Sequence, residues 1–196
     1  MKLLVARHGE TNFNQQRKFY GNLDVPLNKK GGQQAQILAH KVIAKKLTML
    51  VQTNLQRTRA TLAPVRHQLP SIPVLTIPDL AEKGFGCWEG LDANQIQAQD
   101  PEHWQKWLNA PLTYTPPTIE SVVDFRKRVK RGLNWLLNHS QADDTIFLVA
   151  HLGTLRIIYQ ELIDARTDFY SLEFQAGCYT EYIINSKTIK LGKINA

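Results

Sequence analysis

Apolar positions along the chain follow two different patterns, and the two patterns alternate. Short, largely apolar runs at residues 2–6, 48–52 and 145–150 predict buried strands. Between these runs, apolar residues recur every three or four positions, which predicts amphipathic helices. Strands that alternate with helices are typical of parallel sheets covered on both faces. The pattern therefore predicts an α/β fold, a three-layer α/β/α sandwich around a mostly parallel sheet.

The helical pattern is clearest in four places. One helix is expected from Gly32, a second from near Leu55, a third over about 120–139 and a fourth after His151. The third carries an apolar stripe at helical spacing, formed by Val122, Phe125, Val129, Leu133 and Leu136.

Weaker signals complete the expected order of elements. Residues 73–77 predict a short strand, and residues 177–184 predict a last strand followed by a hairpin turn at Asn185-Ser186. Residues 91–119 contain four prolines with Trp104 and Trp107, and predict an excursion from the core. We expect a single domain over residues 1–196 that carries this excursion, with the two tryptophans serving packing rather than ligand stacking.

The composition fits a globular protein, with 43% hydrophobic and 21% charged residues. No stretch reaches the roughly 18 apolar residues of a membrane span. The apolar run after Met1-Lys2 is too short for the core of a signal peptide, so we expect no membrane partner and a cytoplasmic location. Cys87 and Cys178 are too few for a disulfide scaffold or a cysteine-rich zinc site.

The charge balance favours an anionic partner. The formal net charge is +7, from 24 Lys and Arg against 17 Asp and Glu, which suits phosphate esters, nucleic acid or a membrane surface. The densest basic run, residues 126–131, lies in the predicted long helix. A solvated helix face is the simpler interpretation of this run, and nucleic-acid binding is the alternative.

The candidate chemistry lies where the strands end. Arg7-His8-Gly9 follows the first strand, Arg57 lies just past the second, and His151 ends the strand at 145–150. Because parallel strands end at one edge of a sheet, we expect these side chains to converge. Histidine is suited to attack and proton transfer near neutral pH. Gly9 would let the backbone approach a ligand closely.

Two histidines, two arginines and a carboxylate suit phosphoryl transfer. Arginine binds phosphate oxygens with a planar fork of N–H donors, and we expect Arg7, Arg57 and protonated His151 to hold the three non-bridging oxygens. The N-terminus of the helix after His151 adds further donors. His8 is the expected nucleophile.

The departing oxygen needs a proton, and the glycine-rich loop at residues 80–90 holds the candidate acids. Glu82 is the expected acid. Glu89 in the same loop is the alternative.

Five ordered motifs, at residues 7–14, 20–31, 55–61, 80–90 and 149–156, resemble those of the histidine phosphatase superfamily, in its phosphoglycerate mutase-like branch. The resemblance implies a phosphoglycerate mutase-like fold and a phosphohistidine at His8. It implies that Glu82 acts as acid and then as base, and that Arg57 rather than Arg59 binds phosphate. It implies neither a metal ion nor another cofactor.

The resemblance also implies substrate contacts at five positions, namely Gly9, Asn14, Tyr20, Gly21 and Leu152. Asn14 is expected as a further phosphate donor, and a turn cap is the alternative role for this residue. Leu152 stands where glycine is common in the family. Its backbone N–H survives, but a positive φ would be costly for leucine.

The predicted function is that of a metal-independent phosphomonoesterase acting on a small phosphorylated metabolite. The modest length disfavours a mutase, which usually carries a longer insertion. Overall length, Tyr20-Gly21 and Gly177-Cys178-Tyr179 resemble the α-ribazole-5′-phosphate phosphatases of cobalamin biosynthesis. The alternatives are a broad-specificity sugar-phosphate phosphatase, a phosphoglycerate mutase, and a catalytically weak anion- or nucleic-acid-binding protein.

Overall fold

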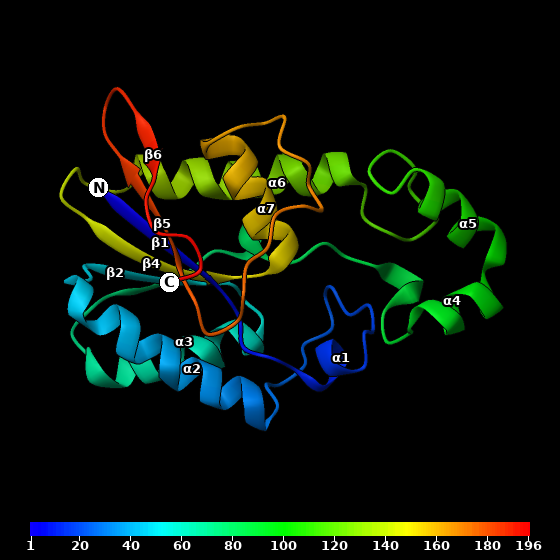
Figure 1. The fold of residues 1–196 in the computed structure, drawn as a ribbon, viewed down its shortest axis with the longest axis horizontal. Helices are drawn as coiled ribbons and strands as arrows, with labels where there is room; N and C mark the ends of the chain where they lie inside the picture. The colour runs from blue at the N-terminus through cyan, green and yellow to red at the C-terminus, as the bar shows by residue number, and fades with distance from the viewer.

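The computed structural model describes residues 1–196, and its six strands form one sheet in the order β3-β2-β4-β1-β5-β6 (Figure 1). Strands β1 to β4 are parallel, whereas β5 runs antiparallel to both β1 and β6. The predicted α/β class with a mostly parallel sheet is confirmed. The strands are β1 (Lys2–Arg7), β2 (Met49–Gln52), β3 (Val74–Thr76), β4 (Thr145–Ala150), β5 (Thr180–Ile184) and β6 (Ile189–Leu191).

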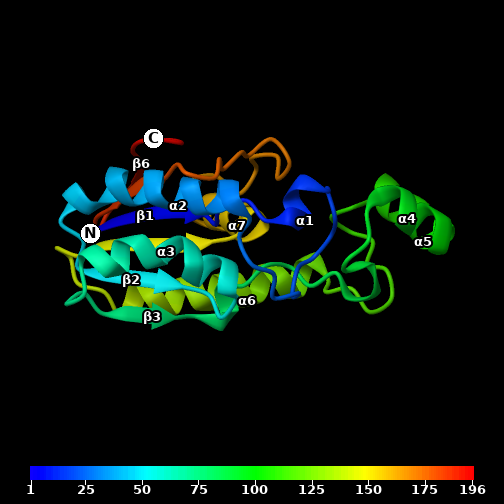
Figure 2. The same cartoon turned by 90° about the horizontal axis from the view of Figure 1, so that it is seen from below.

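Helices cover both faces of this sheet (Figures 1 and 2). The α-helices are α1 (Asn12–Gln15), α2 (Lys29–Val42), α3 (Gln56–Gln68), α4 (Ala93–Gln99), α5 (Pro101–Asn109), α6 (Val122–Asn138) and α7 (Leu152–Leu162). Three short 3₁₀ helices are η1 (Ile43–Lys45), η2 (Pro78–Leu80) and η3 (Gly86–Trp88).

Alternation along the strands divides the core into two layers. Leu3 and Val5 pack with residues of α6 and α7, whereas Leu4 and Ala6 pack with residues of α2 and α3. Every residue of β4 is buried, as expected for a central parallel strand. This packing fixes the ends of β1, β2 and β4 side by side.

The predicted excursion extends away from the sheet and contains α4 and α5 (Figure 1). It has an apolar cluster of its own, formed by Trp88, Ile96, Trp104 and Ile119. Trp104 and Trp107 stack with ring centroids 5.2 Å apart, so the expected packing role is confirmed for Trp104. Trp107 also reaches a cavity described below.

The two largest differences from the expected element boundaries are three residues each. Helix α2 begins at Lys29 rather than Gly32, because the Asn28 side chain caps it by accepting a hydrogen bond from Gly31 N at 2.8 Å. The last predicted strand is shorter, since Gly177 has a φ of 83° and β5 starts at Thr180. No helix is both long and apolar enough to cross a membrane.

Candidate active site

The strand ends bring the predicted histidines together. His8 N donates to Ala150 O at 3.0 Å, which continues the pairing of β1 with β4. The ring centroids of His8 and His151 are 5.2 Å apart. Both side chains are buried. The ends of β1 and β4 therefore lie side by side, as predicted, although they are more than a hundred residues apart in sequence.

The hydrogen bond made by Nδ1 sets the tautomer of His8. Nδ1 lies 2.8 Å from Gly9 O, and since a carbonyl only accepts, Nδ1 carries the proton and Nε2 keeps its lone pair. Burial, with Arg57 and Arg7 adding to it, holds the pKa of His8 well below its ordinary value of 6.5. Tyr20 Oη lies 3.4 Å from Nε2, so it donates to that nitrogen. His8 is thus a neutral imidazole with an available nucleophilic nitrogen.

The second histidine has both ring nitrogens occupied by protein groups. Arg57 Nε donates to His151 Nδ1 at 3.3 Å, so the proton sits on Nε2, which donates to Thr53 Oγ1 at 3.0 Å. Burial, with Arg57 and His8 adding to it, also lowers the pKa of His151 well below 6.5. In this geometry the ring is neutral and both of its nitrogens contact protein groups, and the role of a protonated His151 in holding a phosphoryl oxygen stays a prediction.

Arg57 is fully buried beside the two histidines. Its terminal nitrogens donate to Gly21 O at 2.7 Å and Leu23 O at 2.8 Å. With Nε engaged by His151, two of its five N–H donors remain. Arg59, two residues on, instead pairs with Asp24 across 3.6 Å at the surface. The predicted contrast between the two arginines agrees with their burial.

A cationic cavity of about 260 Å³ lies in front of these groups. Of the predicted site residues, it is lined by Arg7, His8, Asn14, Tyr20, Gly21, Glu82 and Leu152. Arg57, His151 and Gly9 do not line it. Two further cations, Arg17 and Lys18, lie in its wall, and no sequence motif pointed to them. Arg17 has a φ of 54°, a turn conformation that no local pattern announced.

Asn14 both caps α1 and faces the cationic cavity. Its Oδ1 accepts from Thr11 N at 3.0 Å, and its backbone N donates to Thr11 Oγ1 at 3.1 Å. The amide group donates to Tyr20 Oη at 2.6 Å. The two expectations for Asn14, a turn cap and a polar site residue, are therefore compatible.

Gly9 is small for a different reason from the one expected. A Cβ here would lie 2.4 Å from Gly31 O, so glycine allows α2 to pack against the loop after β1. Its N–H donates to Thr61 Oγ1 at 2.9 Å, and its carbonyl orients His8. Gly9 therefore orients His8 through its carbonyl oxygen and permits the close packing of this loop against α2.

Leu152 causes no backbone strain. It is the first residue of α7 and does not have a positive φ. Its side chain lines the cationic cavity and also a second, apolar cavity beside it. The leucine therefore lies at the junction of the two.

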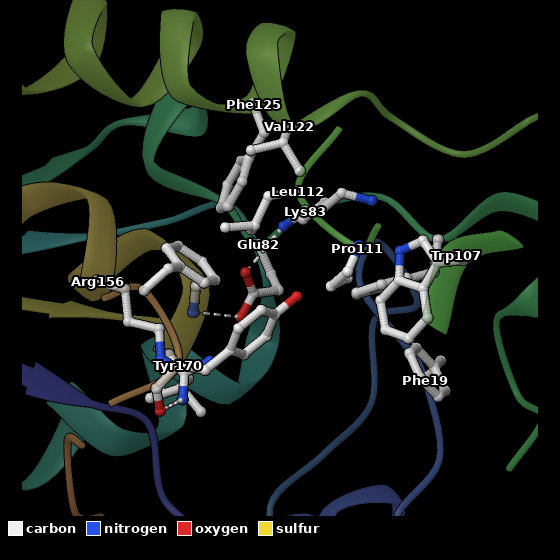
Figure 3. Close-up of a pocket in the computed structure, with 14 residues that line it drawn as sticks. Phe19, Glu82, Lys83, Trp107, Pro111, Leu112, Val122, Phe125, Arg156 and Tyr170 are labelled. Atoms are coloured by element: carbon white, nitrogen blue, oxygen red, sulfur yellow. Dashed lines mark hydrogen bonds between the residues drawn. The ribbon is translucent and has the colours of Figure 1, made fainter. Parts of the chain in front are cut away.

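The apolar cavity has a volume of about 220 Å³, and nine of its 14 lining residues are hydrophobic (Figure 3). Phe19, Glu82, Phe85 and Leu152 line both cavities. The excursion contributes Trp107, Pro111 and Leu112, and α7 contributes Arg156.

Glu82 lies where the two cavities join. Its carboxylate accepts from Lys83 N at 2.9 Å and from Gly153 N, at the start of α7, at 3.1 Å (Figure 3). Glu89 accepts instead from Asn22 N at 2.8 Å and Phe85 N at 2.9 Å, and lines neither cavity. The geometry favours Glu82 over Glu89 as the acid.

Arg128 holds the loop that carries Glu82. Its guanidinium donates to the carbonyl oxygens of Asp79, Ala81 and Glu82 at 2.7–3.0 Å and to both carboxylate oxygens of Glu120. The interpretation of the basic run as a solvated helix face is therefore wrong for Arg128. Its position next to Val129, at the edge of the apolar stripe, was the available signal.

Comparison with known proteins identifies the family to which the chain belongs. The family model of the histidine phosphatase superfamily, branch 1, matches residues 3–196. The chain belongs to this superfamily, so the predicted family and its phosphoglycerate mutase-like fold are confirmed.

Individual relatives cover most or all of the chain. It is 28% identical to the adenosylcobalamin/alpha-ribazole phosphatase of Escherichia coli K12, over 100% of this chain and 96% of that protein. It is 25% identical to phosphoserine phosphatase 1 of Hydrogenobacter thermophilus, over 100% and 92%. The crystal structure of the alpha-ribazole phosphatase from Shigella flexneri superposes with a TM-score of 0.92 at 29% identity, covering 100% and 96%.

Other relatives are much longer. Three mycobacterial proteins are 30% identical over 84% of this chain, which spans only 44% of their length.

Proposed function

We propose that the chain is a metal-independent phosphomonoesterase that forms a phosphohistidine at His8 Nε2. The observation that carries the proposal is the tautomer of His8. Its Nδ1–H is bound to Gly9 O, so the lone pair of Nε2 lies in a cavity lined by Arg7, Arg17 and Lys18. A phosphate dianion in that cavity meets both its cationic donors and its nucleophile.

The first step transfers the phosphoryl group to the enzyme. His8 Nε2 attacks phosphorus, the bond from phosphorus to the ester oxygen breaks, and Glu82 in its acid form gives that oxygen a proton. The substrate phosphate displaces the Tyr20 hydroxyl from Nε2, and Tyr20 and Asn14 become donors to its oxygens. Arg57 donates to His151 Nδ1 and so orients that ring beside His8.

The second step releases phosphate. Glu82, now a carboxylate, takes a proton from water while the water oxygen attacks phosphorus. The bond from phosphorus to Nε2 breaks, and its electron pair returns to the imidazole. The amides of Lys83 and Gly153 hold the carboxylate in place through both steps.

The position of Glu82, which lines both cavities, supports a division of the substrate between them. The ester oxygen must lie within reach of Glu82, where the cavities join. The phosphate then occupies the cationic cavity and the leaving alcohol the apolar one. An engineered cavity of about 150 Å³ binds benzene, so the apolar cavity, of about 220 Å³, has room for an aromatic ring.

Among small phosphorylated metabolites, we propose α-ribazole-5′-phosphate as the preferred substrate. Its leaving group carries an aromatic base that would fill the apolar cavity, and the names of the relatives from E. coli and S. flexneri point to the same compound. Phosphoserine, named for the H. thermophilus relative, has a small polar leaving group that would leave this cavity largely unfilled.

The nucleic-acid alternative loses its main support. The basic run of α6 is largely neutralised within the protein, because its cations are held by Asp79, Glu120 and Glu161. Lys127 is the member of this run that makes no ion pair. Paired cations release few counterions, so they contribute little to nucleic-acid affinity.

Phosphate release from a panel of metabolites in the presence of a chelator tests the proposal. The panel comprises α-ribazole-5′-phosphate, phosphoserine and glucose 6-phosphate, with the His8→Ala variant as control. We expect the highest kcat/KM for α-ribazole-5′-phosphate, no effect of the chelator, and no turnover by the variant. Equal turnover of all three compounds would favour the broad-specificity alternative. Activity that needs added metal, or none at all, would contradict the proposal.

A further inference from the structure

Lys83 places a cation in the wall of the apolar cavity, directly after the proposed acid. The residue is only 9% exposed, although lysine is rarely buried so deeply without a partner. No carboxylate lies within 4.0 Å of its ammonium nitrogen, and that nitrogen makes no hydrogen bond with another protein group. The N–H donors of this ammonium therefore have no acceptor within the protein.

The nearby acidic groups are engaged elsewhere. Glu120 is held by Arg128 at 2.6 and 2.8 Å and accepts from Gly84 N at 2.9 Å. The Glu82 carboxylate accepts from two backbone amides. The ammonium lies over the Phe85 ring, whose centroid is 4.6 Å away. A ring face attracts a cation but offers no lone pair to its N–H groups.

The side chain of Lys83 extends away from the Glu82 carboxylate (Figure 3). Because Glu82 meets the ester oxygen, whatever lies deeper in the apolar cavity belongs to the leaving group. Burial lowers the pKa of Lys83 to about 8 while Glu120 and Glu82 act in the opposite direction, so the ammonium is still charged at pH 7.

We propose that Lys83 is a specificity-determining residue whose ammonium binds a hydrogen-bond acceptor, above all an anionic one, on the leaving group of the substrate. The inference rests on the proposed function, since it takes the apolar cavity as the leaving-group site. An acceptor on an otherwise apolar leaving group would supply the partner that the ammonium lacks within the protein.

Arg156 is the other cation of the apolar cavity, but the protein already uses it. Its guanidinium donates to Leu172 O at 2.9 Å and Tyr170 O at 3.3 Å and lies over the rings of Phe169 and Tyr170. Arg156 therefore holds the segment at residues 169–172 against α7. Lys83 is the cation left to contact a ligand.

Three phosphate esters of related alcohols provide the test. Benzyl phosphate has no acceptor on its ring, 3-pyridylmethyl phosphate has a neutral one, and 3-carboxybenzyl phosphate has an anionic one. The wild-type protein is compared at pH 7 with Lys83→Met and with Lys127→Met. Lys127 is exposed on α6 and lies outside both cavities, so its substitution is a matched loss of one positive charge.

We expect the wild-type kcat/KM for 3-carboxybenzyl phosphate to exceed that for benzyl phosphate by about 10- to 100-fold, the range of a hydrogen bond to a charged group. The pyridyl ester should fall between them. Lys83→Met should lose this preference, mainly through KM, so its loss of kcat/KM should be much larger on the carboxylated ester than on benzyl phosphate. Lys127→Met should behave as the wild type does.

Two results would overturn the inference. An equal loss by Lys83→Met on all three esters would show that Lys83 only supports the position of Glu82. An unchanged preference in that variant would place recognition of the acceptor elsewhere. A thermal melt shows whether the variant is folded, and Lys83→Gln provides a second variant if Lys83→Met is not.

Calorimetry with the corresponding phosphonates, which cannot be hydrolysed, separates this inference from the proposed function. Tighter binding of the carboxylated phosphonate that depends on Lys83 would support the inference even if none of the esters turns over. Equal binding of the three phosphonates to the wild-type protein would contradict it, whatever the catalytic activity.

Discussion

Substitution of Gly153 by alanine should separate catalysis from stability. A Cβ at this position would lie 2.4 Å from Glu82 Oε1 and 3.2 Å from Cε1 of Phe125. Favourable contacts between non-bonded atoms begin near 3.5 Å, so the carboxylate must retreat by about 1 Å. Its hydrogen bond from Gly153 N, at 3.1 Å, would be strained at the same time.

A displacement of about 1 Å can cost about 100-fold in rate when it misplaces a catalytic group. We therefore expect Gly153→Ala to lower kcat for benzyl phosphate, whose alcohol is a poor leaving group, by about 100-fold. The loss for p-nitrophenyl phosphate should be far smaller, because that leaving group hardly needs a proton. Alanine is favoured over glycine in a helix by about 1 kcal/mol, so the variant should not unfold more readily than the wild type.

Gly32→Ala is the matched control. Gly32 lies exposed within α2, and a Cβ there would meet nothing within 4 Å. Its Tm should rise by about 2–4 °C with unchanged kinetics. Full activity of Gly153→Ala on benzyl phosphate would refute the reasoning, and so would equal losses on the two substrates, since both are incompatible with a displaced acid.

Three further predictions concern the charged groups of the site. Arg57→Met should lower kcat/KM severely, because that guanidinium is fully buried among the site residues. Arg59→Met should change kcat/KM little, since a surface ion pair is worth under about 1 kcal/mol. Similar losses of kcat/KM in the two variants would contradict this assignment. Glu82→Gln should slow benzyl phosphate hydrolysis by about 10²–10⁴-fold and spare p-nitrophenyl phosphate, and equal slowing of both would make Glu89 the next candidate. Burial lowers the pKa of His8, so its charged form should appear only at a more acidic pH than in an exposed histidine. An NMR titration of the free protein measures this pKa. Half-protonation at pH 6.5 or above would disprove the prediction.

The sequence predicts those parts of the site that depend on periodicity. The apolar runs locate β1, β2 and β4, and parallel strands end at a common edge, so His8, Arg57 and His151 could be placed together. The same argument predicts the layers of the fold. These features follow from local patterns that alternate in a regular order.

Contacts between distant loops leave no such pattern. Arg128 holds carbonyl oxygens 46 to 49 residues away, and in sequence it is one cation in a basic run. Gly153 is small because Glu82 approaches it from another loop. The neutral state of His151 depends on the burial of its ring and on two partners from the segment after β2. Each of these properties arises from tertiary packing.

The central claim is that His8 Nε2 accepts the phosphoryl group, and trapping of the phosphoenzyme tests it most directly. The protein is mixed with substrate labelled in its phosphate, denatured within milliseconds, and divided between acid and base before peptide mapping. We predict label on the peptide that contains His8, labile in acid, stable in base and absent from His8→Ala. Wild-type turnover without a labelled protein, or label on any other residue, would contradict the account.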